Sequence, residues 1–130
     1  MQTDRRGHFK FFKKVKMKIY GIPNCNTMTK AMDWLTENNV EFEFHDYKKI
    51  GISKIRLEEW SLAVGWEELI NKKGTTWRML NPDAQKKISN KKVAFDLMID
   101  KPSIIKRPVI EFNDTIVVGF DEEVYKQFLA

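Results

Sequence analysis

Apolar residues follow two different spacings in the first part of the chain. Residues 16–21 form a short run typical of a buried strand, and a Pro-Asn turn follows it. Between residues 26 and 38, apolar side chains recur with the spacing of one helical face. Residues 40–45 then alternate between apolar and polar, which predicts a half-buried strand with His45 on its polar side. Strand, helix and strand in this order predict a βαβ unit whose two strands are parallel.

The spacing of apolar residues changes twice in the second half of the chain. From residue 53 to about residue 100 the spacing is helical throughout, which predicts an all-helical insert. Two strands are expected at 109–112 and 115–118, joined by Asn113-Asp114 in a tight antiparallel turn, and Asp121 is placed to cap a final helix. The order β-α-β, insert, β-β-α predicts an α/β protein. We expect a thioredoxin-like fold with a four-stranded mixed sheet and the helical insert between its halves.

Charge divides the chain into two parts. The sequence carries 23 Lys and Arg against 18 Asp and Glu, but residues 1–16 hold six of the basic residues and one of the acids. Residues 17–130 are therefore neutral, and we expect them to be one domain preceded by a basic arm that is disordered or not native. Because the basic excess belongs to the arm, direct nucleic-acid binding is not expected. Membrane insertion is not expected either, since no apolar run reaches about 18 residues.

Cys25 is the single cysteine, and it stands at the mouth of the first predicted helix. The first amides of a helix lack intrahelical partners and the dipole there is positive, so a thiolate is favoured. A free thiol has a pKa of about 8.5, and such surroundings lower it. The alternative is a small packed hydrophobe, but a polar segment after a proline turn is an unusual place for one. One cysteine forms no internal disulfide, and we expect a cytoplasmic protein.

Arg107-Pro108 precedes the third predicted strand and is the second candidate site. The residue before proline is held extended, and a cis bond there fixes a tight approach. In the expected topology this approach is toward the cysteine loop, where Arg107 would supply a permanent positive charge. The alternative for Arg107 is a surface cation. The two histidines, His8 and His45, have no other metal-ligating residues near them at the spacing of a metal site, so no metal site is expected.

Three motifs in order carry a family resemblance: YGIPNCNT around Cys25, KGTTWR at residues 73–78, and IIKRP before the hairpin. Together they make residues 17–130 resemble the arsenate reductase-like (ArsC/Spx) family, most of all its YffB-like branch. The resemblance implies a thioredoxin-like fold with a helical insert and a redox cysteine at Cys25. It also implies that Pro108 is cis and that Arg107 stands at the place of a catalytic arginine.

Departures from the family pattern separate its branches. The arsenate reductases have a histidine and an arginine where this chain has Gly21 and Thr29, and two further arginines where it has Glu67 and Gly119. Loss of these groups removes most of the charge that would hold arsenate, so arsenate reduction is disfavoured. The Spx regulators commonly carry a C-x-x-C switch, but the residue three after Cys25 is Met28. An intramolecular disulfide switch is excluded.

The remaining interpretation is a glutathione-dependent thiol reductase, in which a lone thiolate attacks an oxidised sulfur and an outside thiol resolves the mixed disulfide. Glutathione would be a co-substrate and not a bound cofactor, glutaredoxin is a candidate partner, and a monomer is expected. Cys25 and Arg107 would carry the chemistry. We expect the substrate to be bound by Thr27, Lys30, Arg78 and Pro108. The alternative for Lys30 and Arg78 is that they are solvated surface cations. The alternative function is an Spx-like regulator or another module that binds RNA polymerase.

Overall fold

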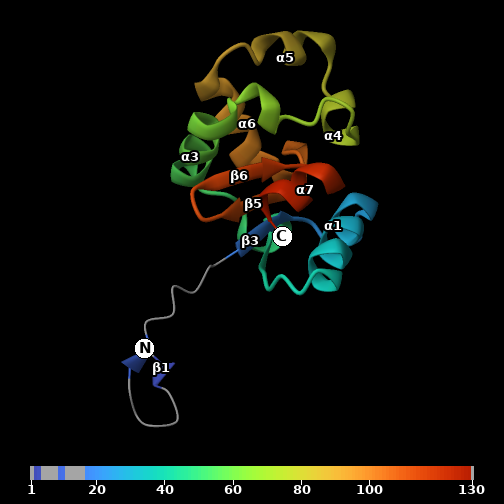
Figure 1. Cartoon of the computed structure of the whole chain (residues 1–130). Helices are drawn as coiled ribbons and strands as arrows, with labels where there is room; N and C mark the ends of the chain where they lie inside the picture. Colours follow the sequence, from blue (N-terminus) through green and yellow to red (C-terminus); the bar gives the residue numbers. More distant parts are fainter. Residues whose placement is uncertain (1, 4–8, 11–16, 130) are drawn as a thin grey trace.

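The computed structural model describes residues 2–3, 9–10 and 17–129 (Figure 1). In the N-terminal segment, β1 (Gln2–Thr3) pairs antiparallel with β2 (Phe9–Lys10). Most of the basic arm at residues 1–16 lies outside the described residues, so the expectation about its order stays a prediction.

One mixed sheet forms the centre of the domain, with the strand order β4-β3-β5-β6. Its strands are β3 (Met17–Gly21), β4 (Glu43–Asp46), β5 (Val109–Phe112) and β6 (Thr115–Val118). β3 pairs parallel with β4 and antiparallel with β5, and β5 pairs antiparallel with β6. The predicted α/β class and the four-stranded mixed sheet are confirmed.

Helices cover both faces of this sheet. They are α1 (Asn26–Glu37), α2 (Tyr47–Ile50), α3 (Lys54–Val64), α4 (Thr75–Arg78), α5 (Pro82–Lys87), α6 (Lys91–Asp100) and α7 (Glu122–Phe128), with 3₁₀ turns η1 (Glu67–Leu69) and η2 (Pro102–Ile104). The helical insert is confirmed and occupies the upper half of Figure 1. Within the described residues, no helix is long and apolar enough to cross a membrane.

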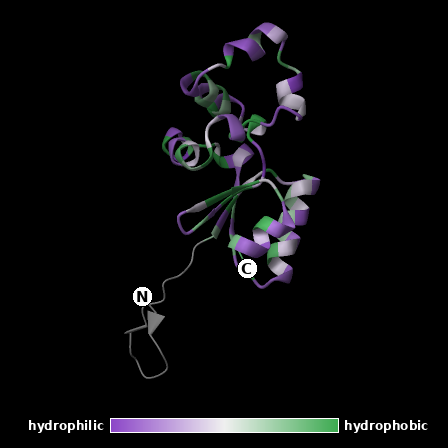
Figure 2. Cartoon of the chain, turned by 45° about the horizontal axis from the view of Figure 1, so that its top comes forward, coloured by the Kyte–Doolittle hydropathy of each residue, from purple (hydrophilic) through white to green (hydrophobic). Residues whose placement is uncertain are grey.

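Side-chain alternation along the strands produces two hydrophobic clusters, one on each face of the sheet. Ile19 of β3 and Ile110 of β5 are opposite each other and pack with α1 and α7. Their neighbours Tyr20 and Val109 point to the other face and pack with α3 and α6. Hydrophobic segments, coloured green, lie along the central sheet beside polar ones (Figure 2).

Side chains at the helix starts fix where the insert helices begin. Ser53, Asn81 and Asn90 accept hydrogen bonds from the amides of Arg56, Ala84 and Val93, respectively. These bonds satisfy donors that a helix leaves free in its first turn. Asp121 does the same for α7, accepting from Glu123 and Val124. The predicted cap at Asp121 is confirmed.

The strand predicted at residues 40–45 is wrong in its start and in its phase. It begins at Glu43, because the Val40 amide donates to Leu35 O and so belongs to the end of α1. Phe44 is 36% exposed, whereas His45 is half-buried and stacks at 4.6 Å from the Tyr20 ring. β4 is an edge strand, so its apolar side chain extends past the helices while its polar one contacts the core.

Candidate active site

Cys25 occupies the N-cap position of α1, directly after β3. Asn24 turns the chain with a φ of 60°, and Cys25 itself is extended with φ −121° and ψ 128°. The Cys25 carbonyl accepts the first helical hydrogen bond from the Thr29 amide at 3.0 Å. The half-buried sulfur therefore lies at the end of the helix where the free amides are.

The surroundings of Cys25 favour its thiolate. Burial of the sulfur raises the pKa of the Cys25 thiol, but hydrogen bonding from the Met28 amide, the Arg107 guanidinium and the Thr27 amide lowers it more, and the positive charge of Arg107 adds to this. The pKa of Cys25 is thus below its ordinary value. The structure brings together Cys25 and Arg107, although 82 positions separate them in the sequence.

Arg107 is oriented by the segment that precedes it. Its Nη1 donates to Ser103 O at 2.9 Å, and the Ser103 hydroxyl lies 2.8 Å from the Thr76 hydroxyl on α4. The Arg107–Pro108 peptide bond is cis, as the resemblance implies, and Pro108 is buried. The guanidinium is consequently held by Ser103, which Thr76 of the insert contacts in turn, while it faces the cysteine loop.

Two buried donors near this site have no partner among the described residues. They are Arg107 Nε and the hydroxyl of Tyr47, which is 1% exposed. Burial raises the pKa of Tyr47 well above its ordinary value despite the opposing charge of Arg107, so the hydroxyl stays protonated. Leaving a buried donor without an acceptor costs roughly 1–3 kcal/mol. The unpaired Nε of Arg107 is therefore a cost to the fold that accompanies the placement of the guanidinium beside Cys25.

The predicted substrate-binding residues are placed unevenly. Thr27 is exposed in the first turn of α1, and its amide acts on Cys25. Lys30 and Arg78 are exposed on α1 and α4, and neither side chain forms a hydrogen bond or ion pair with another residue in 17–129. Both interpretations of Lys30 and Arg78, substrate binding and solvated cation, therefore stay predictions.

Packing explains why position 21 carries no side chain. A Cβ on Gly21 would lie 2.3 Å from Met28 Sδ, and Met28 is 1% exposed. A histidine at position 21 would therefore require Met28 to move within a dense core. Gly21 departs from the arsenate reductase pattern and Met28 departs from the C-x-x-C pattern. The close approach of these two positions couples the two departures.

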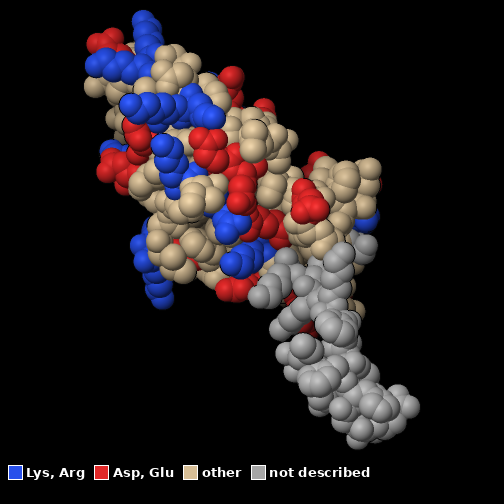
Figure 3. Space-filling view, turned by 90° about the vertical axis from the view of Figure 1, so that its left-hand side faces the viewer, with Lys and Arg blue, Asp and Glu red and all other residues tan. Residues whose placement is uncertain are grey.

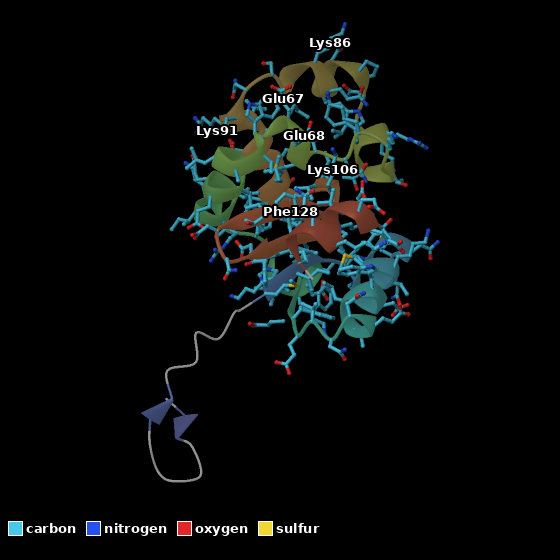
Figure 4. The ribbon with its side chains drawn as sticks, viewed as in Figure 1. Glu67, Glu68, Lys86, Lys91, Lys106 and Phe128 are labelled. Carbon is cyan, nitrogen blue, oxygen red and sulfur yellow. The ribbon has the colours of Figure 1, made fainter. Side chains whose placement is uncertain are left out.

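The other two departures also bear on charge near the site. Gly119 adjoins Pro108, since its amide donates to Pro108 O at 2.7 Å. Glu67 is exposed in η1 beside Glu68, which pairs with Lys106 at 3.5 Å (Figure 4). A glycine and a carboxylate therefore stand where the arsenate reductases carry arginines. Throughout the part of the chain that the structure describes, no group of three or more His, Cys, Asp or Glu is arranged to hold a metal ion.

Sequence reasoning missed the residues that support Arg107. Ser103, Thr76 and Tyr47 come from η2, α4 and α2, and they reach the site only through the tertiary fold. Their types and spacings give no local signal, because a serine after a proline and a threonine at a helix start are common in any turn.

The lowered pKa makes a direct prediction about thiol reactivity. We expect the rate of Cys25 alkylation by iodoacetamide to rise with pH and to reach half of its maximum below about pH 8.5. The depressed folded-state pKa also stabilises the fold above the unfolded pKa, and this contribution is lost as the pH falls through the folded pKa. The midpoint is measured by quenching the alkylation at several times at each pH and reading the modified fraction from the intact mass. A midpoint at or above that of a cysteine peptide would contradict the assignment.

Topology and site together define a class. A mixed β-α-β/β-β-α sheet, a cysteine of lowered pKa at the start of α1 and a cis proline next to it characterise a thioredoxin-like protein of the thiol oxidoreductase type. Comparison with protein-family models matches residues 20–128 to the ArsC family. The chain belongs to the ArsC family, which confirms the resemblance.

Individual relatives agree with this assignment. An uncharacterized protein of Haemophilus influenzae is 36% identical over 112 residues, which is 86% of this chain and 97% of that protein. The global transcriptional regulator Spx of Lactiplantibacillus plantarum is 27% identical over 85% of this chain and 84% of its own. The solved structure of a YffB protein has 41% identity and a TM-score of 0.82, covering 88% of this chain and 99% of its own. An ArsC-related protein from Brucella melitensis has 39% identity and a TM-score of 0.71, covering 88% and 95%.

Proposed function

We propose that this protein is a thiol oxidoreductase that works with glutathione through Cys25 alone. The observation that carries the proposal is a half-buried thiol whose pKa is lowered by two helix amides and by Arg107, in a chain with no second cysteine. Such a thiolate attacks a disulfide sulfur, and the mixed disulfide that results must be resolved by an outside thiol. Glutathione supplies that thiol in a reducing compartment, and we propose the cytoplasm as the location.

The charges around Cys25 support a carboxylate-bearing thiol substrate. Arg107 lies beside the sulfur, and Lys30 and Arg78 are exposed cations whose side chains have no hydrogen bond or ion pair with another residue in 17–129. Glutathione has two carboxylates, which such groups would bind. Pro108, which follows Arg107 through a cis bond, would contact the substrate beside the sulfur.

Incubation with oxidised glutathione is expected to produce a single mixed disulfide at Cys25. One accessible thiolate with no resolving partner predicts a one-to-one adduct that reduced glutathione removes. Intact-mass spectrometry measures both steps, and Cys25→Ser is the control that should gain no mass. Absence of any adduct on the native protein would refute the proposal.

Arsenate is expected to be reduced poorly in the same assay with glutathione and glutaredoxin. Gly21, Thr29, Glu67 and Gly119 leave Arg107 as the one cation at the matched positions, and a dianionic oxyanion needs more donors than this. Rapid arsenate turnover would instead assign the chain to the reductase branch.

The second candidate is a regulator that binds RNA polymerase. It is supported by the 27% identity to Spx over most of the chain. Purified RNA polymerase retained by the immobilised protein, equally with native Cys25 and with Cys25→Ser, would favour this function. If the immobilised protein retains no RNA polymerase and Cys25 forms a glutathione adduct, the oxidoreductase function is favoured.

A further inference from the structure

Charge in the domain is segregated, although its total is zero. Residues 71–92 of the insert contain seven Lys and Arg and one Asp, a net charge of +6, so the remainder of residues 17–130 has a net charge of −6. We call the seven side chains the basic end of the insert: Lys72, Lys73, Arg78, Lys86, Lys87, Lys91 and Lys92. All seven are exposed. Figure 3 shows Lys and Arg gathered at the upper end of the molecule, where Lys86 points outward in Figure 4.

The basic end is not neutralised by its own fold. Among the residues that the structure describes, only Lys91 of these seven forms an ion pair, with Glu58 at 3.0 Å. Like charges on neighbouring turns repel each other by a few tenths of a kcal/mol per pair. Segregation of this kind orients and attracts a partner of opposite charge and raises its association rate.

The basic end is also linked to the active site. α4 belongs to the same segment, and Thr76 on α4 contacts Ser103, whose carbonyl holds Arg107 beside Cys25. A partner bound along α4 therefore contacts the segment that positions Arg107, and α5 extends the same basic surface toward the upper end of the molecule.

The composition of the surface favours a protein over a nucleic acid. Met79, next to Arg78, is 80% exposed, and apolar area among cations matches a mixed protein surface better than a phosphate backbone. Surfaces that bind single-stranded nucleic acid usually add exposed aromatic rings for base stacking. Trp77 is half-buried instead, and Lys72 Nζ covers its ring at 5.4 Å.

We propose that the basic end of the insert recruits acidic protein segments that carry a glutathione mixed disulfide, which Cys25 then reduces. The inference rests on the proposed function. The Cys25 thiolate attacks the glutathione sulfur, so the Cys25–glutathione disulfide forms and the peptide thiolate leaves and takes a proton. A second glutathione thiolate attacks that disulfide and releases oxidised glutathione with the Cys25 thiolate restored. The net reaction consumes one free glutathione, whose sulfur is oxidised as the peptide sulfur is reduced; the other half of the oxidised glutathione is the group that left the peptide.

Two glutathionylated peptides of equal length test this, one with glutamates around its cysteine and the other with lysines. At low ionic strength we expect the acidic peptide to be reduced about tenfold faster, and the advantage to vanish at about 1 M salt, where the Debye length is about 3 Å. Lys86→Glu/Lys87→Glu should remove the advantage. Lys54→Glu/Lys126→Glu changes the net charge equally on α3 and α7 and should keep it.

A binding measurement separates this inference from the proposed function. Fluorescence anisotropy of the acidic peptide with its cysteine replaced by serine reports docking without thiol chemistry, and a duplex DNA oligomer serves as competitor. Docking lost in Lys86→Glu/Lys87→Glu supports the surface even if no peptide is reduced, in which case the proposed function fails. Equal rates and equal binding for the two peptides, or stronger binding of the DNA, would overturn the inference.

Discussion

Replacing Arg107 with alanine is expected to raise the pKa of the Cys25 thiol and to slow its reaction with oxidised glutathione at neutral pH by about tenfold. The guanidinium stabilises the thiolate by a hydrogen bond and by its charge, and a charge-assisted hydrogen bond contributes roughly 1.5–3 kcal/mol. The pH dependence of alkylation and the rate of adduct formation measure the two effects. An unchanged alkylation profile would contradict the pairing of Arg107 with Cys25.

Two variants make this result specific. Arg107→Lys keeps the charge but loses the forked geometry, so it separates the electrostatic part of the effect from the hydrogen bond. Arg78→Ala removes an exposed cation that has no partner among residues 17–129, and it should leave the alkylation midpoint unchanged. If Arg78 binds a glutathione carboxylate, this variant raises KM without moving the pKa of Cys25.

Arg107→Ala is also expected to affect the stability of the fold. A surface-facing arginine, the alternative that the sequence left open, would contribute little to stability. Arg107 instead donates to Ser103 O and has a buried Nε. Loss of one neutral-acceptor hydrogen bond costs about 1 kcal/mol. Urea unfolding should therefore show a small decrease in the free energy of unfolding beside the large decrease in thiol reactivity.

Local chemistry explains which elements the sequence predicted correctly. Helix starts carry their own signal, since Ser53, Asn81 and Asn90 precede periodic apolar residues and then accept amide hydrogen bonds in the structure. Cys25 was predicted for the same reason, because a turn followed by a helix places the residue between them at free amides.

Tertiary contacts explain what was missed. The alternation at residues 40–45 indicated which side chains are apolar but not that β4 is an edge strand, where Phe44 lies beyond the covering helices. Likewise, Ser103 and Thr76 orient Arg107 through contacts between segments far apart in the chain. Resemblance to a family identified the arginine, but the residues that position it required coordinates.

A half-buried carboxylate on β5 is a further feature that no sequence pattern indicated. Glu111 accepts hydrogen bonds from the Tyr20 hydroxyl at 2.6 Å, from Trp60 Nε1 at 2.9 Å and from Arg56 Nη1 at 3.0 Å. Its side chain is 14% exposed. Burial and the bond to Glu111 raise the pKa of Tyr20, so the tyrosine remains a donor at all ordinary pH values. One side chain thus joins β3, β5 and α3 across the face of the sheet that the insert covers.

Glu111→Ala is therefore expected to be the most destabilising of the substitutions considered, by about 3 kcal/mol. It leaves three donors on that face without their acceptor, and two of them, Tyr20 and Trp60, are almost fully buried. Urea unfolding followed by Trp fluorescence measures the loss.

Glu111→Gln retains an acceptor oxygen and should lose less, whereas Glu122→Ala removes an exposed carboxylate and should change stability by less than about 0.5 kcal/mol. The alkylation midpoint of Cys25 should be the same in folded Glu111→Gln as in the native protein, because Glu111 is not among the groups that shift the pKa of that thiol. Native-like stability of Glu111→Ala would show that the insert is held to the sheet by apolar packing alone.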